Sequence, residues 1–207
     1  MLPPRLRAAA WHRLIPTTTS QMLAFDIETM GLDKRKHEIT CACAYDAASG
    51  IKRSFVFQLG DSHEEFLQLL DQADALCAFN GFRFDVPFIV HRWNVPAVRY
   101  SAWIQKLFDP FEVCKTVLDR TFKLDRLLEA NGLPVKTGSG LEAIKMAAEK
   151  RYTELVDYCM HDTVMTHAVC TLPSMVLPVA TGTPGSRLRM QVRPAFRFVV
   201  EPTAAVA

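Results

Sequence analysis

The chain has 207 residues, 49% of them hydrophobic and 22% charged, with a formal net charge of +2; this composition is typical of one globular domain and excludes a disordered or collagen-like chain. No apolar run approaches the ~20 residues that a membrane-spanning helix requires, so we expect no membrane association. The six cysteines lie mostly within apolar runs and lack zinc-ligand spacing, which indicates reduced, buried thiols in the cytoplasm or another reducing compartment.

The predicted strands come first along the chain, and helices dominate later. Short apolar runs predict strands at 21–26, 38–45, 52–59 and 75–79. Apolar stripes, capping residues and Gly or Pro breakers predict helices at 63–73, 86–93, 96–107, 124–130, 141–149 and 151–172. This order predicts an α/β domain with a mixed central sheet flanked by helices.

Basic segments flank this predicted domain. Residues 1–20 hold three arginines and no acid, and residues 171–207 hold four arginines, one acid and five prolines. We therefore divide the chain into a basic N-terminal arm at 1–20, one folded domain at 21–170 and a Pro-punctuated basic tail at 171–207. Basic ends suit a polyanionic partner, although they can equally serve only to keep the ends soluble. The tail fits a protein partner as well. Because the arm also resembles a mitochondrial transit peptide, a mitochondrial location is the alternative.

Two acids close the first predicted strand, in Phe25-Asp26-Ile27-Glu28-Thr29. Side chains two apart on a strand point to the same face, so Asp26 and Glu28 would lie together. Two neighbouring carboxylates repel each other and are costly to desolvate, and a cation between them would remove that cost. The alternative is that the strand has ended and both acids are solvated.

A third acid follows the fourth predicted strand, in the segment Asn80-Gly81-Phe82-Arg83-Phe84-Asp85. Asp85 precedes a predicted helix, so it is either a functional acid or a helix N-cap. The last acid lies on the longest predicted helix, in Tyr158-Cys159-Met160-His161-Asp162. Tyr158 and Asp162 are four residues apart and share a helix face, where they could form a buried hydrogen bond or lie in solvent.

The order of the three motifs is more specific than any one of them. A strand with Asp-x-Glu, then Asn-Gly-x-x-Phe-Asp, then a helical Tyr-x-x-x-Asp resembles the DEDDy branch of the DnaQ-like 3′–5′ exonucleases, which have a ribonuclease H-like fold. The resemblance extends from about Leu23 to Thr166 and is closest to the proofreading-type domains of family B DNA polymerases and to small stand-alone members. The His-type branch would have His at position 157, which is Asp157 here, so the Tyr branch matches better.

The resemblance implies a metal-dependent exonuclease domain at 21–170. Members hold two divalent ions, Mg²⁺ or Mn²⁺, and the matching ligands here are the carboxylates of Asp26, Glu28, Asp85 and Asp162. Oxygen ligands suit such hard cations. The match makes Tyr158 the residue that orients the attacking water. It implies hydrolysis at the 3′ ends of single-stranded nucleic acid, DNA more than RNA, with release of nucleoside 5′-monophosphates.

The same match implies a set of substrate contacts. Thr29 would meet the terminal nucleotide, Leu32 would wedge between the last two bases, and Asn80 would bond near the terminal sugar or phosphate. Phe84 would pack on the terminal nucleotide or belong to the core, and Lys136 would contact a phosphate. The alternative function is a non-catalytic nucleic-acid-binding or structural subunit of a nucleoprotein assembly that retains the fold.

Overall fold

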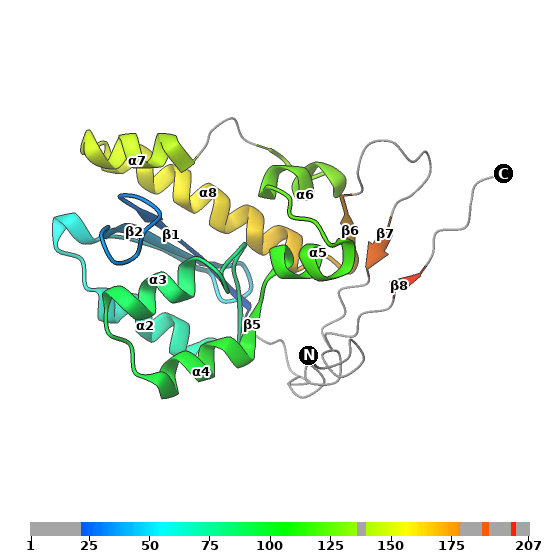
Figure 1. Ribbon diagram of the computed structural model, residues 1–207, viewed down its shortest axis with the longest axis horizontal. Coiled ribbons are helices and arrows are strands. Elements are labelled where there is room, and N and C mark those ends of the chain that lie inside the picture. Colours follow the sequence, from blue (N-terminus) through cyan, green and yellow to red (C-terminus); the bar gives the residue numbers. More distant parts are fainter. Residues whose placement is uncertain (1–21, 136–139, 179–187, 191–199, 202–207) are drawn as a thin grey trace.

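The main sheet has five strands in the order β3-β2-β1-β4-β5 (Figure 1). In the computed structural model, which describes residues 22–135, 140–178, 188–190 and 200–201, these strands are β1 (Met22–Thr29), β2 (Ile39–Asp46), β3 (Ile51–Val56), β4 (Ala75–Cys77) and β5 (Leu107–Phe108). β1, β2 and β3 are antiparallel neighbours, whereas β4 runs parallel to both β1 and β5. The predicted mixed sheet is confirmed.

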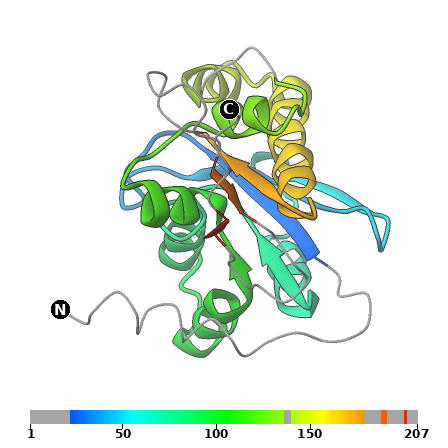
Figure 2. The same ribbon diagram turned by 90° about the vertical axis from the view of Figure 1, so that its right-hand side faces the viewer.

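Seven α-helices lie in the described part of the chain. The bounds are α2 (His63–Gln72), α3 (Asp85–Arg92), α4 (Ala97–Lys106), α5 (Pro110–Leu118), α6 (Leu124–Ala130), α7 (Gly140–Ala148) and α8 (Tyr152–Cys170). Figures 1 and 2 show α2, α3 and α4 on one side of the sheet and α7 and α8 on the other. The fold is therefore a helix–sheet–helix arrangement in which β1 is central.

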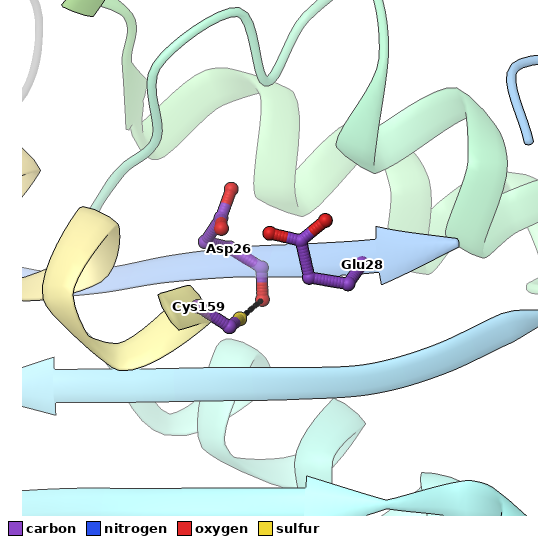
Figure 3. Close-up of side chains that lie close together, drawn as sticks. All are labelled: Asp26, Glu28 and Cys159. Carbon is purple, nitrogen blue, oxygen red and sulfur yellow. Dashed lines mark hydrogen bonds between the residues drawn. The ribbon is translucent and has the colours of Figure 1, made fainter. Parts of the chain in front are cut away.

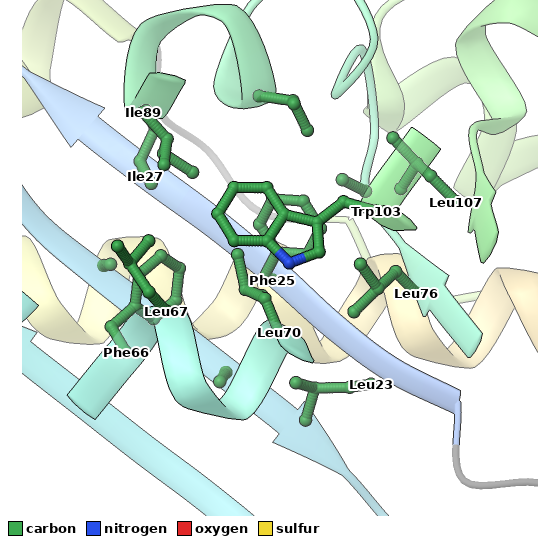
Figure 4. Close-up of a cluster of buried hydrophobic side chains, with 14 of the residues drawn as sticks. Leu23, Phe25, Ile27, Phe66, Leu67, Leu70, Leu76, Ile89, Trp103 and Leu107 are labelled. Carbon is green, nitrogen blue, oxygen red and sulfur yellow. The ribbon is translucent and has the colours of Figure 1, made fainter. Parts of the chain in front are cut away.

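The alternation of side chains along β1 assigns each face of the strand to a different layer. Leu23, Phe25 and Ile27 belong to the core formed with α2, α3 and α4, around the fully buried Trp103 (Figure 4). The intervening residues point toward α8, and the first of them, Ala24, belongs to a separate apolar cluster. Asp26 and Glu28 have the same parity as Ala24, so the period-two pattern places them on the α8 side.

β4 ends early, and this leaves part of the central strand open. β4 pairs only with Met22 to Ala24 of β1, so beyond Ala24 the β4-side edge of β1 has no strand partner. An unpaired backbone N–H at a buried edge is costly and requires another acceptor. For the Ile27 N–H, an acidic side chain, that of Asp85, supplies it.

The structure differs from the predicted elements in several places; among them, β1 continues to Thr29 beyond the predicted 21–26, and β4 ends at Cys77 within the predicted 75–79. β3 ends at Val56 and one 3₁₀ turn, η1 (Phe57–Leu59), replaces its predicted last residues. β5 and α5 were not predicted, because two residues form too short a strand to detect and α5 is rich in β-branched and aromatic residues. The tail, predicted to be irregular, contains a small antiparallel sheet of β6 (Met175–Leu177), β7 (Leu188–Met190) and β8 (Val200–Glu201).

All six cysteines are buried and free, as predicted. None of the helices in the described residues combines the length and the apolar character needed to cross a membrane.

Candidate active site

The candidate site begins at the C-terminal half of β1. Asp26 and Glu28 are both partly buried, and their carboxyl groups lie on the same side of the strand (Figure 3). One ligand atom from each of Asp26, Glu28 and Cys159 lies within 4.8 Å of the others. The predicted pairing of the two acids on one face therefore holds.

Asp85 joins this strand through its backbone. Asp85 is the first residue of α3 and only 2% exposed, and its Oδ1 accepts a hydrogen bond from the Ile27 N–H at 3.2 Å. Ile27 lies between Asp26 and Glu28, on the open edge beyond the end of β4. The Asp85 carboxylate thus accepts a hydrogen bond from β1. Asp85 is not the N-cap of α3, because Phe84 occupies that position.

α8 brings the third motif to the same strand. The Cys159 Sγ donates to the Asp26 backbone oxygen at 3.5 Å, and this contact fixes α8 against β1 (Figure 3). Tyr158 precedes Cys159, and Asp162 lies four residues beyond Tyr158, so both belong to the helix surface beside this contact. The three motifs therefore meet at one place, although Asp26 and Asp162 are 136 positions apart in the sequence.

The pKa values of Asp26 and Asp85 are raised by burial and, for Asp26, by the neighbouring carboxylates. Burial raises the pKa of the Asp26 carboxyl well above its ordinary value, and three neighbouring carboxylates raise it further, in descending order Asp85, Glu28 and Asp162. Burial also raises the pKa of Asp85 to about 7. A group of acids that oppose one another's ionisation is the environment that a divalent cation would stabilise.

The donor set fits a hard cation better than a soft one. The four carboxylates offer oxygen ligands, which Mg²⁺ and Mn²⁺ prefer. Cys159 lies close enough to be a ligand, but burial, together with hydrogen bonds to Cys41 and Cys43, raises its thiol pKa well above the ordinary value. Since a thiol must lose its proton to bind metal, Cys159 serves here as a neutral donor that braces Asp26. We conclude that Asp26, Glu28, Asp85 and Asp162 are the residues suited to hold divalent ions.

The raised pKa values predict an unusual pH dependence of stability without metal. The folded protein binds more protons than the unfolded chain between the ordinary carboxyl pKa and the raised values of Asp26 and Asp85. The free energy of unfolding in EDTA should therefore rise as the pH falls from about 8 to about 5.5, and added Mg²⁺ should stabilise the protein more at the higher pH. Urea unfolding at several pH values, compared with Asp85→Asn, measures this. A pH slope that is the same in both proteins would contradict it.

Tyr158 is a protonated hydrogen-bond donor at any working pH. Partial burial raises its phenol pKa, and the charges of Asp162, Glu28, Asp26 and Asp125 raise it further, in that order. The phenol therefore keeps its proton beside the acids, which suits a group that donates to a water or to a phosphate oxygen and does not suit a general base.

The predicted substrate residues have different environments. Leu32 is 80% exposed in the loop after β1 and projects freely. Thr29 is buried, its hydroxyl donates to the Gly31 oxygen at 2.7 Å, and it pairs with Ile39 of β2 at the end of β1. Phe84 is half-buried and packs on Phe88 at the edge of the core. Lys136 lies outside the described residues.

Asn80 lies in a turn held by an acid that the sequence reasoning missed. Asn80 adopts a left-handed conformation with φ of 67°, which Asn tolerates better than most residues. Buried Asp109 accepts from the Asn80 N–H at 2.9 Å and the Phe82 N–H at 3.1 Å, and also caps α5 through the Phe111 N–H. A signal was present, because Asp109 followed by Pro110 is the usual start of a helix.

Gly81 makes this turn possible by lacking a side chain. A Cβ at Gly81 would lie 2.6 Å from the Cβ of Ala78, closer than two carbon atoms can approach. The turn therefore brings the chain back tightly after β4 and sets the start of α3, and with it the position of Asp85.

Comparison with known proteins gives a family and many similar solved structures, among them a polymerase and a nuclease. A model of the RNase_H superfamily matches residues 23–172. No curated protein matches the sequence. The structure is similar to a family B DNA polymerase from the hyperthermophilic archaeon Pyrobaculum calidifontis, with a TM-score of 0.56 and 18% identity, covering 71% of this chain and 23% of the polymerase chain.

The second neighbour is a nuclease in its apo form, with a TM-score of 0.50 and 19% identity over 79% of this chain and 72% of the nuclease. At these identities the two neighbours support the fold, and the polymerase match concerns less than a quarter of that protein. The family assignment rests on the superfamily model, which spans most of the chain and agrees with the mixed five-stranded sheet. The chain belongs to the RNase_H superfamily.

Proposed function

We propose that the chain is a metal-dependent 3′–5′ exonuclease of the DEDDy type, acting on the 3′ ends of single-stranded nucleic acid, DNA more than RNA, and releasing nucleoside 5′-monophosphates. The observation that carries the proposal is the geometry at the C-terminal half of β1, where Asp26 and Glu28 lie together, Asp85 bonds the strand between them, and α8, which bears Tyr158 and Asp162, contacts Asp26 through Cys159. The buried free thiols also favour work in a reducing compartment.

The acids would hold two divalent ions. Asp26 is the central ligand, since the other three carboxylates all act on it. Asp85 is held in place by the Ile27 N–H, which donates to its Oδ1, so its carboxylate is fixed beside β1, where it would offer an oxygen to a cation. Two divalent cations, when bound, stabilise the attacking and departing oxygens of a phosphodiester hydrolysis.

The remaining residues position the reactants. Tyr158, kept protonated by burial and by the acids, would donate a hydrogen bond that orients the attacking water toward the phosphorus. Exposed Leu32 would lie against the terminal bases, where an apolar side chain tolerates any base. Asn80, in the turn fixed by Asp109, would bond the terminal sugar or phosphate.

Labelled oligonucleotides test the proposal. Single-stranded DNA and RNA labelled at the 5′ end should shorten stepwise with Mg²⁺ or Mn²⁺ and stay intact in EDTA, with DNA shortened faster. A substrate blocked at its 3′ end should resist, and one blocked at its 5′ end should not. Binding without shortening under both metals would instead support a non-catalytic nucleic-acid-binding subunit.

Tyr158→Phe should lower turnover by about 10- to 100-fold and leave the affinity for oligonucleotide largely unchanged. The ring remains and fills the same space, so only the hydrogen bond to water is lost. Tyr152→Phe, on the same helix and packed in the cluster with Tyr158, is the matched control and should keep the wild-type rate. Single-turnover rates and anisotropy titrations separate the two quantities. A wild-type rate in Tyr158→Phe would remove the water-orienting role.

A further inference from the structure

An open pocket of about 530 Å³ lies on the outer side of α3, away from the sheet. Its apolar lining comes from Pro87 and Val90 of α3 and from Val95, which follows the helix. Its volume is in the range of pockets that hold small ligands. None of the candidate site acids lines it, so it is a separate feature of the surface.

The polar lining of this pocket carries no carboxylate. It consists of an ammonium, an imidazole, an amide and a phenol, from Lys34, His91, Asn94 and Tyr100. Among the ion pairs of the described residues none involves Lys34, because the adjacent Asp33 is paired with Arg35 at 3.2 Å and with Lys36 at 4.0 Å. A pocket lined by a cation that has no ion-pair partner among the described residues, and by no acid, suits an anionic ligand.

The ring of Tyr100, which lines the pocket, gives a second indication of the kind of ligand. Tyr100 is 38% exposed at the pocket, and Asn94 adjoins it with an amide that can both donate and accept hydrogen bonds. An exposed ring suits stacking with a nucleobase, and the ammonium of Lys34, which lines the same pocket, suits the attached phosphate. The combination fits a nucleotide unit better than an inorganic anion.

The pocket is built from the same elements that carry the candidate acids. Lys34 belongs to the loop that continues from Glu28, and Pro87 lies two residues after Asp85. The ion pair between Arg92 and Glu38 ties the end of α3 to the end of this loop. The pocket and the candidate acids therefore share the loop after β1 and the start of α3, and exposed Leu32 lies in that same loop.

The loop that forms one wall is held in a fixed shape. The His37 ring packs on Gly31 so tightly that a Cβ there would lie 2.7–2.9 Å from the ring atoms. The Met30 N–H donates to the Glu38 oxygen at 3.0 Å across the base of the loop. The position of Lys34 opposite α3 is therefore set by the loop before any ligand binds.

We propose that this pocket binds a nucleotide of the single strand upstream of the cleaved 3′ end. This inference rests on the proposed function and adds a second anchoring point for its substrate. Short oligonucleotides that occupy only the acidic site would not reach the pocket, whereas longer ones would fill both. Affinity should therefore increase with length, and the pocket residues should account for that increase.

The test is a binding series with oligothymidylates of about 3 to 15 nucleotides, measured by anisotropy with Ca²⁺ in place of Mg²⁺. Lys34→Ala and Tyr100→Ala should each weaken the longer oligonucleotides by about tenfold and leave the shortest unchanged. Lys34→Ala should also reduce the salt slope for long strands by roughly 0.7. The controls are Lys36→Ala, in the same loop, and Val98→Ala, exposed on α4, neither of which lines the pocket.

The outcomes separate this inference from the proposed function. Variants that bind all lengths like the wild type, or that lose affinity equally for the shortest, would overturn the pocket's role even if hydrolysis is normal. Length-dependent binding that both variants abolish would support the pocket even if no hydrolysis occurs. Binding of poly-glutamate that needs Lys34, without any length dependence for oligonucleotides, would assign the pocket to an acidic peptide and overturn the inference.

Discussion

Asp26→Asn should abolish hydrolysis and at the same time make the metal-free protein more stable. Asp26 is the carboxylate on which the other three acids act, so its loss would remove the proposed central metal ligand. We expect a fall in rate of about 1000-fold or more, the size of several kcal/mol of transition-state stabilisation. Without metal, however, the substitution removes one of several opposing negative charges, which should raise the free energy of unfolding by about 1–3 kcal/mol at pH 8.

The two effects are measured on the same preparation. Hydrolysis is assayed with Mg²⁺, and urea unfolding is followed in EDTA and in Mg²⁺. Asp157→Ala is the control, because Asp157 is exposed on α8 next to Tyr158 and should change neither quantity. If Asp26→Asn is less stable than the wild type in EDTA at pH 8, the acids do not oppose one another as described. If it retains activity, Asp26 is not the central ligand.

Asp109→Ala should be the most destabilising substitution of a polar residue near the site. Asp109 is 2% exposed, and its two oxygens accept from the backbone N–H groups of Asn80, Phe82 and Phe111. Burial raises its pKa to about 6, and the backbone hydrogen bonds oppose this rise, so it is ionised at neutral pH. Removing it leaves buried donors without an acceptor, at about 1–3 kcal/mol each, and we expect a loss of about 3–5 kcal/mol in total.

Asp109→Asn provides the graded comparison. An asparagine oxygen can replace Oδ1, which accepts from Asn80 and Phe111, but its amide would face the Phe82 N–H. The loss of stability should therefore lie between those of the wild type and the alanine variant. Equal stability of all three proteins in urea would show that the turn at 80–82 does not depend on Asp109. The rate of hydrolysis should fall in the same order as the stability, because this turn determines where α3 begins and therefore the position of Asp85.

The local patterns of the sequence were sufficient for four of the five strands of the main sheet and for the acids that share one face of a single element. The alternation in β1 predicts that Asp26 and Glu28 share a face, and the four-residue spacing in α8 predicts the same for Tyr158 and Asp162. Both relations depend only on the geometry of one element. That these elements meet in space came from the family resemblance, because periodicity gives no information about which elements become neighbours.

Other features could not be read from local patterns. The bond from Ile27 to Asp85 depends on where β4 stops, and that is a tertiary property. Asp109 resembles an ordinary helix cap in the sequence, and only the folded chain shows that it also holds the turn at Asn80. The pocket beside α3 likewise depends on a loop and a helix that are far apart in sequence. The roles of the acids and of Tyr158 remain predictions until the variants are measured.

The shortness of β4 has a consequence for how this sheet could change in evolution. A β4 extended by two or three residues would hydrogen-bond to β1 past Ala24 and occupy the Ile27 N–H that Asp85 now uses. A longer ladder would add backbone hydrogen bonds to the sheet. It would also lower the rate of the proposed hydrolysis, because Asp85 would lose its hydrogen bond to the Ile27 N–H. Insertions that lengthen β4 should therefore be tolerated in descendants that only bind nucleic acid and be absent from those that cut it.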